Sequence, residues 1–152
     1  MSTPPRPLLK WAGGKARLAP AIAEVLGGAC RGTYTEPFLG SGAVYLYLRA
    51  KGLVGSAVLS DANARLMAFH EVVRDDPDGL LKALAPYPTV EYREVYYAVR
   101  EAFNAGPIAG AEQAARFLWL NKAGFNGLYR ENKKGRYNVP VGRYKQVALP
   151  SP

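Results

Sequence analysis

The stretch Thr35-Glu36-Pro37-Phe38-Leu39-Gly40-Ser41-Gly42 decides the fold, because it has the pattern of a strand end followed by a glycine turn. Residues 33–36 predict a short strand before the turn, and the apolar residues of 43–51 predict a helix after it. Glycines after a strand let a ligand approach the backbone, and open α/β sheets bind ligands where their strands end. The turn is therefore a candidate ligand site, while an ordinary strand–turn–helix connection stays open as an alternative.

A carboxylate follows the next predicted strand. That strand is expected at Ala57–Ser60, and Asp61 comes directly after it, 19 positions beyond Gly42. A carboxylate at this place can accept both hydroxyls of a ribose. Tyr45 replaces the third glycine of a dinucleotide fingerprint, so a pyrophosphate could not lie as closely on the helix N-terminus. The spacing therefore favours a nucleoside without a pyrophosphate, such as S-adenosylmethionine.

Helices and strands alternate through residues 1–75. Apolar residues between 18 and 26 have helical spacing, and Gly27 is expected to end that helix. Another helix is predicted at about 63–74, after the second strand. This alternation predicts a parallel sheet with right-handed crossovers, and hence an α/β fold.

The pattern then changes to consecutive helices. Asp76 followed by Pro77 is typical of a capped helix start. The stripe of Tyr92, Val95, Tyr96 and Val99 predicts a second, amphipathic helix. A third helix is expected at about 111–120. These residues therefore predict a helical insertion in the α/β layer.

Residues 122–145 carry glycines and a proline between polar and aromatic side chains, which predicts a loop or an exposed hairpin with its turn at Lys133-Lys134-Gly135. The formal net charge of the chain is +8, and residues 116–152 hold eight basic side chains and one acidic one. Lysine and arginine bind phosphates, and aromatic rings stack on bases or wedge between them. This composition is typical of a segment that binds nucleic acid. A solvated basic face beside a few core aromatics is an equally good interpretation of the composition alone.

Several classes of protein are excluded. The single cysteine, Cys30, rules out a disulfide framework and a four-thiolate metal site, and indicates a reducing compartment. It is expected to be a small buried residue, because the only histidine is His70 and no Cys-His pattern surrounds it. The N-terminus lacks the apolar run of a signal peptide, and the longest strongly apolar stretch, 43–48, is far shorter than the ~20 residues of a membrane span. A soluble cytoplasmic protein without a metal site or a membrane partner is expected.

The segment Lys10-Trp11-Ala12-Gly13-Gly14-Lys15 is not a phosphate loop. No glycine lies five residues before Gly14, and Ala16 replaces the hydroxyl residue that would hold magnesium, so an NTPase is not expected. The segment does combine an aromatic plane, two glycines and a cation, which can stack on a ring and pair with a carboxylate. A purely structural role for the same residues stays open.

Four motifs in this order resemble the Dam-type family of DNA adenine-N6 methyltransferases. They are Leu9 to Lys15, Glu36 to Gly42, Ser60-Asp61-Ala62-Asn63, and the segments Gly124 to Arg130 and Tyr137 to Lys145 taken together. The resemblance covers nearly the whole chain and implies an incomplete Rossmann-like sheet. It places the N-terminal part of an S-adenosylmethionine-binding catalytic domain at 1–75, a helical target-recognition region with a basic hairpin at 76–145, and the start of a return to the catalytic domain at 146–152.

The resemblance also assigns cofactor contacts. Trp11 would line the pocket, Lys15 would meet the methionine carboxylate, and Asp61 would bind the ribose. The remaining contacts, which would form the wall at the glycine turn, are Glu36, Phe38 and Gly40.

The DNA-binding positions that the resemblance assigns are Lys10, Lys122, Phe125, Asn126, Arg130, Pro140 and Arg143. Phe125 matches an aromatic that wedges into the base stack. Asn126 and Arg130 match base-reading positions, and an arginine can pair with both guanine acceptors in the major groove. The turn residues Lys133, Lys134 and Arg136 are expected to touch phosphates or nothing.

One implied motif is missing. The family flips adenine out of duplex DNA and holds its amine with an Asp-Pro-Pro-Tyr sequence, whose carboxylate and proline carbonyl accept the amine protons. The only Pro-Pro pair here is Pro4-Pro5, and Ala85-Pro86-Tyr87-Pro88 lacks the carboxylate. We therefore expect no catalytic residue in this chain, which would be the truncated, inactive part of a site-specific enzyme acting on double-stranded DNA, with a C-terminal methyltransferase fragment as partner. The alternatives are a non-catalytic DNA-binding remnant and, disfavoured by Tyr45, a nicotinamide enzyme.

Overall fold

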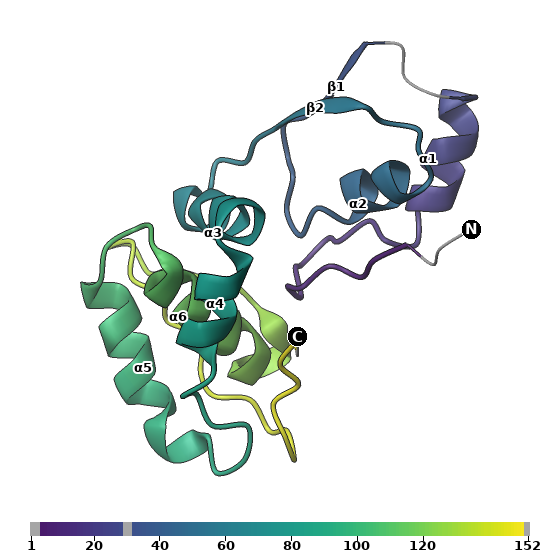
Figure 1. The fold of residues 1–152 in the computed structure, drawn as a ribbon. Coiled ribbons are helices and arrows are strands. Elements are labelled where there is room, and N and C mark those ends of the chain that lie inside the picture. Colours follow the sequence, from purple (N-terminus) through teal and green to yellow (C-terminus); the bar gives the residue numbers. More distant parts are fainter. Residues whose placement is uncertain (1–3, 29–31, 151–152) are drawn as a thin grey trace. The chain divides into compact units, whose positions relative to one another are not determined.

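The computed structural model of the chain describes residues 4–28 and 32–150 (Figure 1). The chain divides into two compact units: the first comprises Met1–Leu8 with Gly13–Ala62, and the second comprises Leu9–Ala12 with Asn63–Pro152. The short segment Leu9–Ala12 thus packs with the second unit although its neighbours in the sequence belong to the first. Cys30, expected to be buried, lies outside the described residues.

The first unit combines two strands with two helices. β1 (Thr33–Glu36) and β2 (Ser56–Leu59) form a two-stranded parallel sheet in which Glu36 pairs with Leu59. α1 (Ala19–Leu26) precedes β1, and α2 (Ala43–Ala50) connects the two strands. The parallel pair confirms the predicted α/β character, and β2 begins one residue earlier than predicted. The buried core of this unit consists of Ala19, Val44, Leu48 and Val54.

Helix α1 ends where the sequence predicts. Gly27 adopts φ 66°, and its N–H donates to the carbonyl of Glu24. The predicted apolar stripe is only partly buried, because Ile22 packs against the core whereas Leu18 and Val25 are exposed. A helix of eight residues presents only a narrow buried face here.

The second unit is helical, and α6 (Ala111–Ala123) lies at its centre. It contacts α3 (Ala64–Asp75), α4 (Pro77–Leu84) and α5 (Arg93–Ala105) (Figure 1). Because α6 has neighbours on several sides, most of its residues are buried, polar ones included. Its largest buried side chains are Phe117, Leu118, Trp119 and Leu120. Within the described ranges 4–28 and 32–150, no helix is long and apolar enough to cross a bilayer.

Side-chain caps begin α3 and α4 at the predicted places. Asn63 and Asp76 each accept a backbone N–H three residues further on, at 3.0 Å, which satisfies a donor that the helix itself cannot pair. The predicted stripe at α5 is buried at Tyr92 and Tyr96, whereas Val95 is 39% exposed. The buried face of this helix is therefore narrower than its sequence suggests.

Residues 122–145 are called the basic loop below. Its first two residues still belong to α6, which runs to Ala123 rather than ending at about 120 as predicted, and the residues from Gly124 onward form a hairpin. Two isolated antiparallel bridges hold it, one between Gly124 and Val141 and one between Glu131 and Tyr137. The turn is at the predicted position, and Gly135 adopts φ 69° there. The basic loop is therefore an irregular hairpin whose shape depends on side chains from the rest of the second unit.

Candidate functional site

The glycine turn lies between β1 and α2 and is hydrogen-bonded to the residues that follow β2. Gly40 and Gly42 both have positive φ, 53° and 73°, which only glycine adopts without strain. The Gly40 N–H donates to Asp61 Oδ2 at 3.0 Å. The backbone N–H of Leu39 donates to the carbonyl of Ser60 at 2.9 Å. The carboxylate of Asp61 is therefore fixed beside the turn, as the sequence spacing predicts.

Glu36 is half-buried at the end of β1, and this burial raises the pKa of its carboxyl above the usual value. Three neighbours partly oppose the shift: the Tyr34 hydroxyl, which donates at 3.0 Å, a backbone hydrogen bond from Tyr45, and the positive charge of Lys15. Lys15 therefore acts electrostatically on the same turn as Asp61. Phe38, by contrast, is 80% exposed, so its ring is available to a ligand or to another part of the protein.

Trp11 belongs to the second unit, whereas the other five predicted cofactor contacts belong to the first. Its ring stacks on Tyr129, with centroids 5.6 Å apart and planes 28° apart, and lies 6.3 Å from the ring of Phe117. Trp11 thus shares an aromatic cluster with the basic loop. A common pocket for Trp11 and Asp61 stays a prediction.

All seven predicted DNA-binding residues lie in the second unit. The side chain of Asn121 connects the segment that carries Lys10 with the turn at Gly127. The Lys10 N–H donates to Asn121 Oδ1 at 2.8 Å. Asn121 Nδ2 donates to the carbonyls of Lys10, at 2.8 Å, and of Gly127, at 3.0 Å. A Cβ on Gly127 would lie 2.4 Å from the Cβ of Lys10. The segment carrying Lys10 therefore packs directly on the turn that carries Phe125 and Asn126.

That turn is a short 3-10 helix, η1 (Phe125–Gly127), which follows α6. The Phe125 N–H donates to the carbonyl of Pro140 at 2.9 Å, so these two positions lie side by side. The Phe125 ring is 46% exposed, although rings of this size usually gain stability by burial. Asn126 adopts φ 53°, a left-handed conformation that asparagine tolerates better than most residues, and it is exposed. The turn thus presents an apolar ring and an amide to the solvent.

The cations of the site differ in their surroundings. Lys122 is half-buried, and its pKa is lowered first by this burial and then by the nearby charge of Lys10. The Lys10 ammonium lies 4.4 Å from the centroid of the Tyr144 ring. Arg143 is exposed. Two ammonium groups that repel one another favour an anion between them, which is consistent with a phosphate-binding role.

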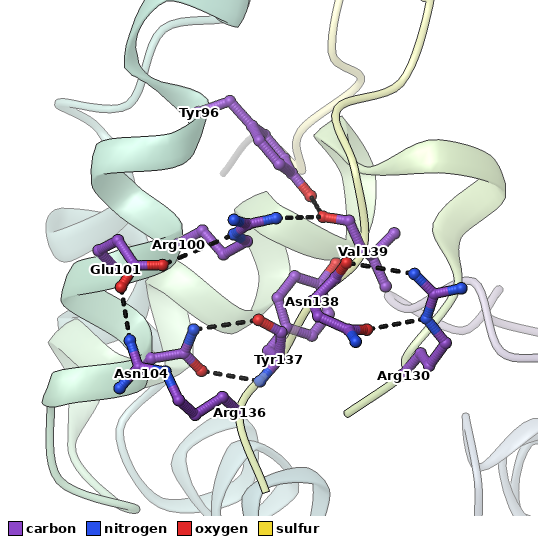
Figure 2. Close-up of polar contacts among 9 residues, drawn as sticks. All are labelled: Tyr96, Arg100, Glu101, Asn104, Arg130, Arg136, Tyr137, Asn138 and Val139. Carbon is purple, nitrogen blue, oxygen red and sulfur yellow. Dashed lines mark hydrogen bonds and ion pairs between the residues drawn. The ribbon is translucent and has the colours of Figure 1, made fainter. Parts of the chain in front are cut away.

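Helix α5 holds the returning half of the basic loop (Figure 2). The side chain of Asn104 pairs with the backbone of Tyr137, accepting its N–H at 2.8 Å and donating to its carbonyl at 3.0 Å. Arg136, expected to touch phosphates or nothing, forms an ion pair with Glu101, and its contact with phosphates stays a prediction. Arg130 bonds to Asn138 across the loop. The sequence therefore predicts correctly that Arg136 lies near the turn, but it does not predict the ion pair with Glu101.

Among the described residues, no group of three His, Cys, Asp or Glu side chains could hold a metal ion. Three asparagines that the sequence did not predict as site residues organise the site: Asn104, Asn121 and Asn138. Only Asn121 had a signal, because it is a polar side chain directly after the apolar run 117–120 on a helix.

The small parallel sheet with its helices is compatible with the α/β fold of S-adenosylmethionine-dependent methyltransferases. A family model described as D12 class N6 adenine-specific DNA methyltransferase matches residues 11–149. The chain therefore belongs to this family, which confirms the resemblance drawn from its motifs.

Curated relatives agree with this assignment. The chain is 40% identical over 157 aligned residues to the Type II methyltransferase M.MjaIII of Methanocaldococcus jannaschii, covering 95% of this chain and 54% of that protein. It is 36% identical to the Type II methyltransferase M1.LlaDCHI of Lactococcus lactis subsp. cremoris and 37% identical to the DNA adenine methylase of Haemophilus influenzae, in each case over 95% of this chain and 50% of the relative. The chain spans about half the length of the curated relatives it matches.

Proposed function

We propose that this chain forms the cofactor-binding and DNA-reading parts of a site-specific DNA adenine-N6 methyltransferase that uses S-adenosylmethionine in the cytoplasm. The observation that carries the proposal is the hydrogen bond between the Gly40 N–H and Asp61, which fixes a carboxylate beside a glycine turn at the ends of two parallel strands. Membership of the family supports the reaction class. In this proposal β1 and β2 are neighbouring strands of a larger Rossmann-like sheet.

The residues of the turn fit S-adenosylmethionine. A carboxylate can accept several hydrogen bonds, so Asp61 would bind the ribose hydroxyls while it also accepts the Gly40 N–H. Lys15 would pair with the methionine carboxylate, and Glu36, Phe38 and Gly40 would form the wall at the glycine turn. Trp11 would line the pocket. The cofactor, when bound, supplies an electrophilic methyl group.

The basic loop would read DNA. Phe125 would insert its exposed ring into the base stack, and Asn126 and Arg130 would contact base edges. Lys10, Lys122, Pro140 and Arg143 would support these contacts. The two ammonium groups near one another would favour binding of a phosphate there.

Methyl transfer requires more than these residues. The exocyclic amine of adenine has a lone pair delocalised into the ring, and the expected Asp-Pro-Pro-Tyr sequence is absent from the 152 residues. We therefore assign the transfer step to a methyltransferase segment carrying that sequence, which would act together with this chain. The second candidate, a DNA-binding remnant without catalysis, is favoured by the same missing sequence.

One experiment separates the two candidates. A separately produced C-terminal half of a relative is added to the chain, and methyl transfer to duplex DNA is followed. Only the first candidate predicts turnover.

The cofactor proposal is tested with Asp61→Ala. Calorimetric titration with S-adenosylmethionine should show binding by the wild-type chain and none by the variant, while affinity for a random duplex stays unchanged. Asp61→Asn keeps an acceptor for Gly40, so it separates loss of the ribose contact from collapse of the turn. The control is Asp78→Ala, in the exposed first turn of α4. Equal cofactor affinity of Asp61→Ala and wild type would refute the assignment.

The DNA proposal is tested with two exposed cations of the basic loop. Arg130→Ala should relax the preference at one base pair by about 1–3 kcal/mol. Lys134→Ala should weaken binding evenly across sequences and reduce the salt slope by about one. The same change in preference from both variants would contradict a reading role for Arg130.

A further inference from the structure

We propose that Asn138 is a positioning residue that presents Arg130 to a base, an inference that rests on the proposed function. Arg130 Nε donates to Asn138 Oδ1 at 2.8 Å, and Arg130 Nη2 donates to the Asn138 carbonyl at 3.3 Å (Figure 2). In return, the Asn138 N–H donates to the Arg130 carbonyl at 3.0 Å. Three hydrogen bonds therefore join the two residues across the basic loop.

These contacts select one edge of the guanidinium group. A guanidinium has five N–H donors in a rigid plane, with one edge formed by Nε and Nη2 and another by the two Nη groups. Asn138 occupies the first edge with its side-chain oxygen and its carbonyl. The second edge is turned away from Asn138, and Arg130 is exposed (Figure 2). That edge has the two-donor pattern that the O6 and N7 acceptors of guanine require.

Asn138 is itself fixed before any DNA arrives. The residue before it, Tyr137, is paired through its backbone with Asn104 of α5 at 2.8 and 3.0 Å. The residue after it, Val139, accepts a hydrogen bond from the buried hydroxyl of Tyr96 at 3.1 Å (Figure 2). Because α5 holds the backbone on both sides, Asn138 provides a rigid support for Arg130. A long side chain held in this way loses less conformational entropy on binding.

The inference is tested by selection from randomised duplexes, using the 152-residue chain and three variants: Asn138→Ala, Arg130→Ala and the double variant. The wild type should prefer guanine at one position, and Arg130→Ala should lose that preference. Asn138→Ala should lower it about tenfold at the same position only, because a hydrogen bond to a charged group is removed. The double variant should match Arg130→Ala, and Asn138→Asp, which keeps the acceptor, should retain the preference.

Two results would overturn the inference while Arg130 keeps its reading role. One is an even loss of affinity of Asn138→Ala for all duplexes, and the other is an effect that adds to that of Arg130→Ala, since both indicate a separate contact of Asn138 with DNA. Asn132→Ala is the matched control, because the side-chain oxygen of Asn132 accepts backbone N–H groups of the turn, and its loss should leave the preference unchanged. An unchanged preference in Arg130→Ala would instead refute the reading role in the proposed function.

A measurement without DNA tests the contact itself. The Nε proton of Arg130 should exchange with water about tenfold more slowly than that of the exposed Arg143. NMR should show the two rates becoming equal in Asn138→Ala. Equal rates already in the wild-type chain would overturn the inference, whatever the chain does with DNA.

Discussion

The side chain of Asn121 forms two hydrogen bonds with the backbone of Lys10: it accepts the N–H and donates to the carbonyl, both at 2.8 Å. The same amide also donates to the carbonyl of Gly127 at 3.0 Å, and its residue is only 4% exposed. A buried amide with each of its groups paired specifies one arrangement of the chain. Asn121 thereby places Lys10 against the turn that carries Phe125.

Asn121→Asp should destabilise the second unit by about 3 kcal/mol, because a buried carboxylate would face two carbonyl oxygens. Urea unfolding followed by the fluorescence of Trp11 and Trp119, both in the second unit, measures the change. Asn132→Asp is the control, since Asn132 Oδ1 only accepts N–H groups at an exposed turn. Equal losses from the two substitutions would show that the Asn121 amide donates no important hydrogen bond.

Gly127→Ala should cost more stability than Gly135→Ala, although both glycines have φ between 60° and 70°. The left-handed backbone alone costs a non-glycine residue about 1–2 kcal/mol. At Gly127 the added Cβ would also lie 2.4 Å from the Cβ of Lys10, whereas at Gly135 it would lie 3.9 Å from Oε2 of Glu131. We expect a difference of about 1–3 kcal/mol in the free energy of unfolding. Identical values would mean that the Lys10 segment is not held against the turn.

DNA affinity should fall as the pH rises through the alkaline range. Burial lowers the pKa of Lys122 in the free protein, and a bound phosphate raises it again, so the complex holds more protons than the free chain. The dissociation constant should therefore increase with pH above the lowered pKa. Lys122→Arg keeps the charge and should remove this dependence in a titration of duplex binding. Lys145→Arg, at an exposed position, should keep it, and a profile shared by both variants would speak against a phosphate at Lys122.

The second unit should lose stability between about pH 10 and 12. Burial raises the pKa of Tyr137 to about 12, whereas an unfolded tyrosine ionises near pH 10. The folded state then binds more protons than the unfolded state, so the contribution is fully present below pH 10 and is lost as the pH rises to 12. Tyr137→Phe should reduce the slope of unfolding free energy against pH by up to about 1.4 kcal/mol per pH unit. Tyr97→Phe, at an exposed ring, is the control, and an unchanged slope in Tyr137→Phe would contradict burial of that hydroxyl.

Much of the first unit could be predicted from local patterns. The strand at 33–36, the positive-φ glycines of the turn and the placement of Asp61 depend on backbone preferences within a few residues and on a regular spacing. The caps at Asn63 and Asp76 are equally local. Two features were not local: the exposure of Val95 depends on which face of α5 packs against the rest of the second unit, and the ion pair of Arg136 depends on a glutamate 35 positions away.

The sequence by itself determined the family, the order of helices and strands, the glycine turn with its carboxylate and the location of the basic loop, because these depend on short motifs and on periodicity. Only the tertiary structure decided which residues support the site. Asn121 reaches Lys10 across 111 positions, and Asn104 reaches Tyr137 across 33. Such pairs form because a buried backbone group must find a hydrogen-bond partner wherever packing brings one, and no local pattern records which distant asparagine will supply it.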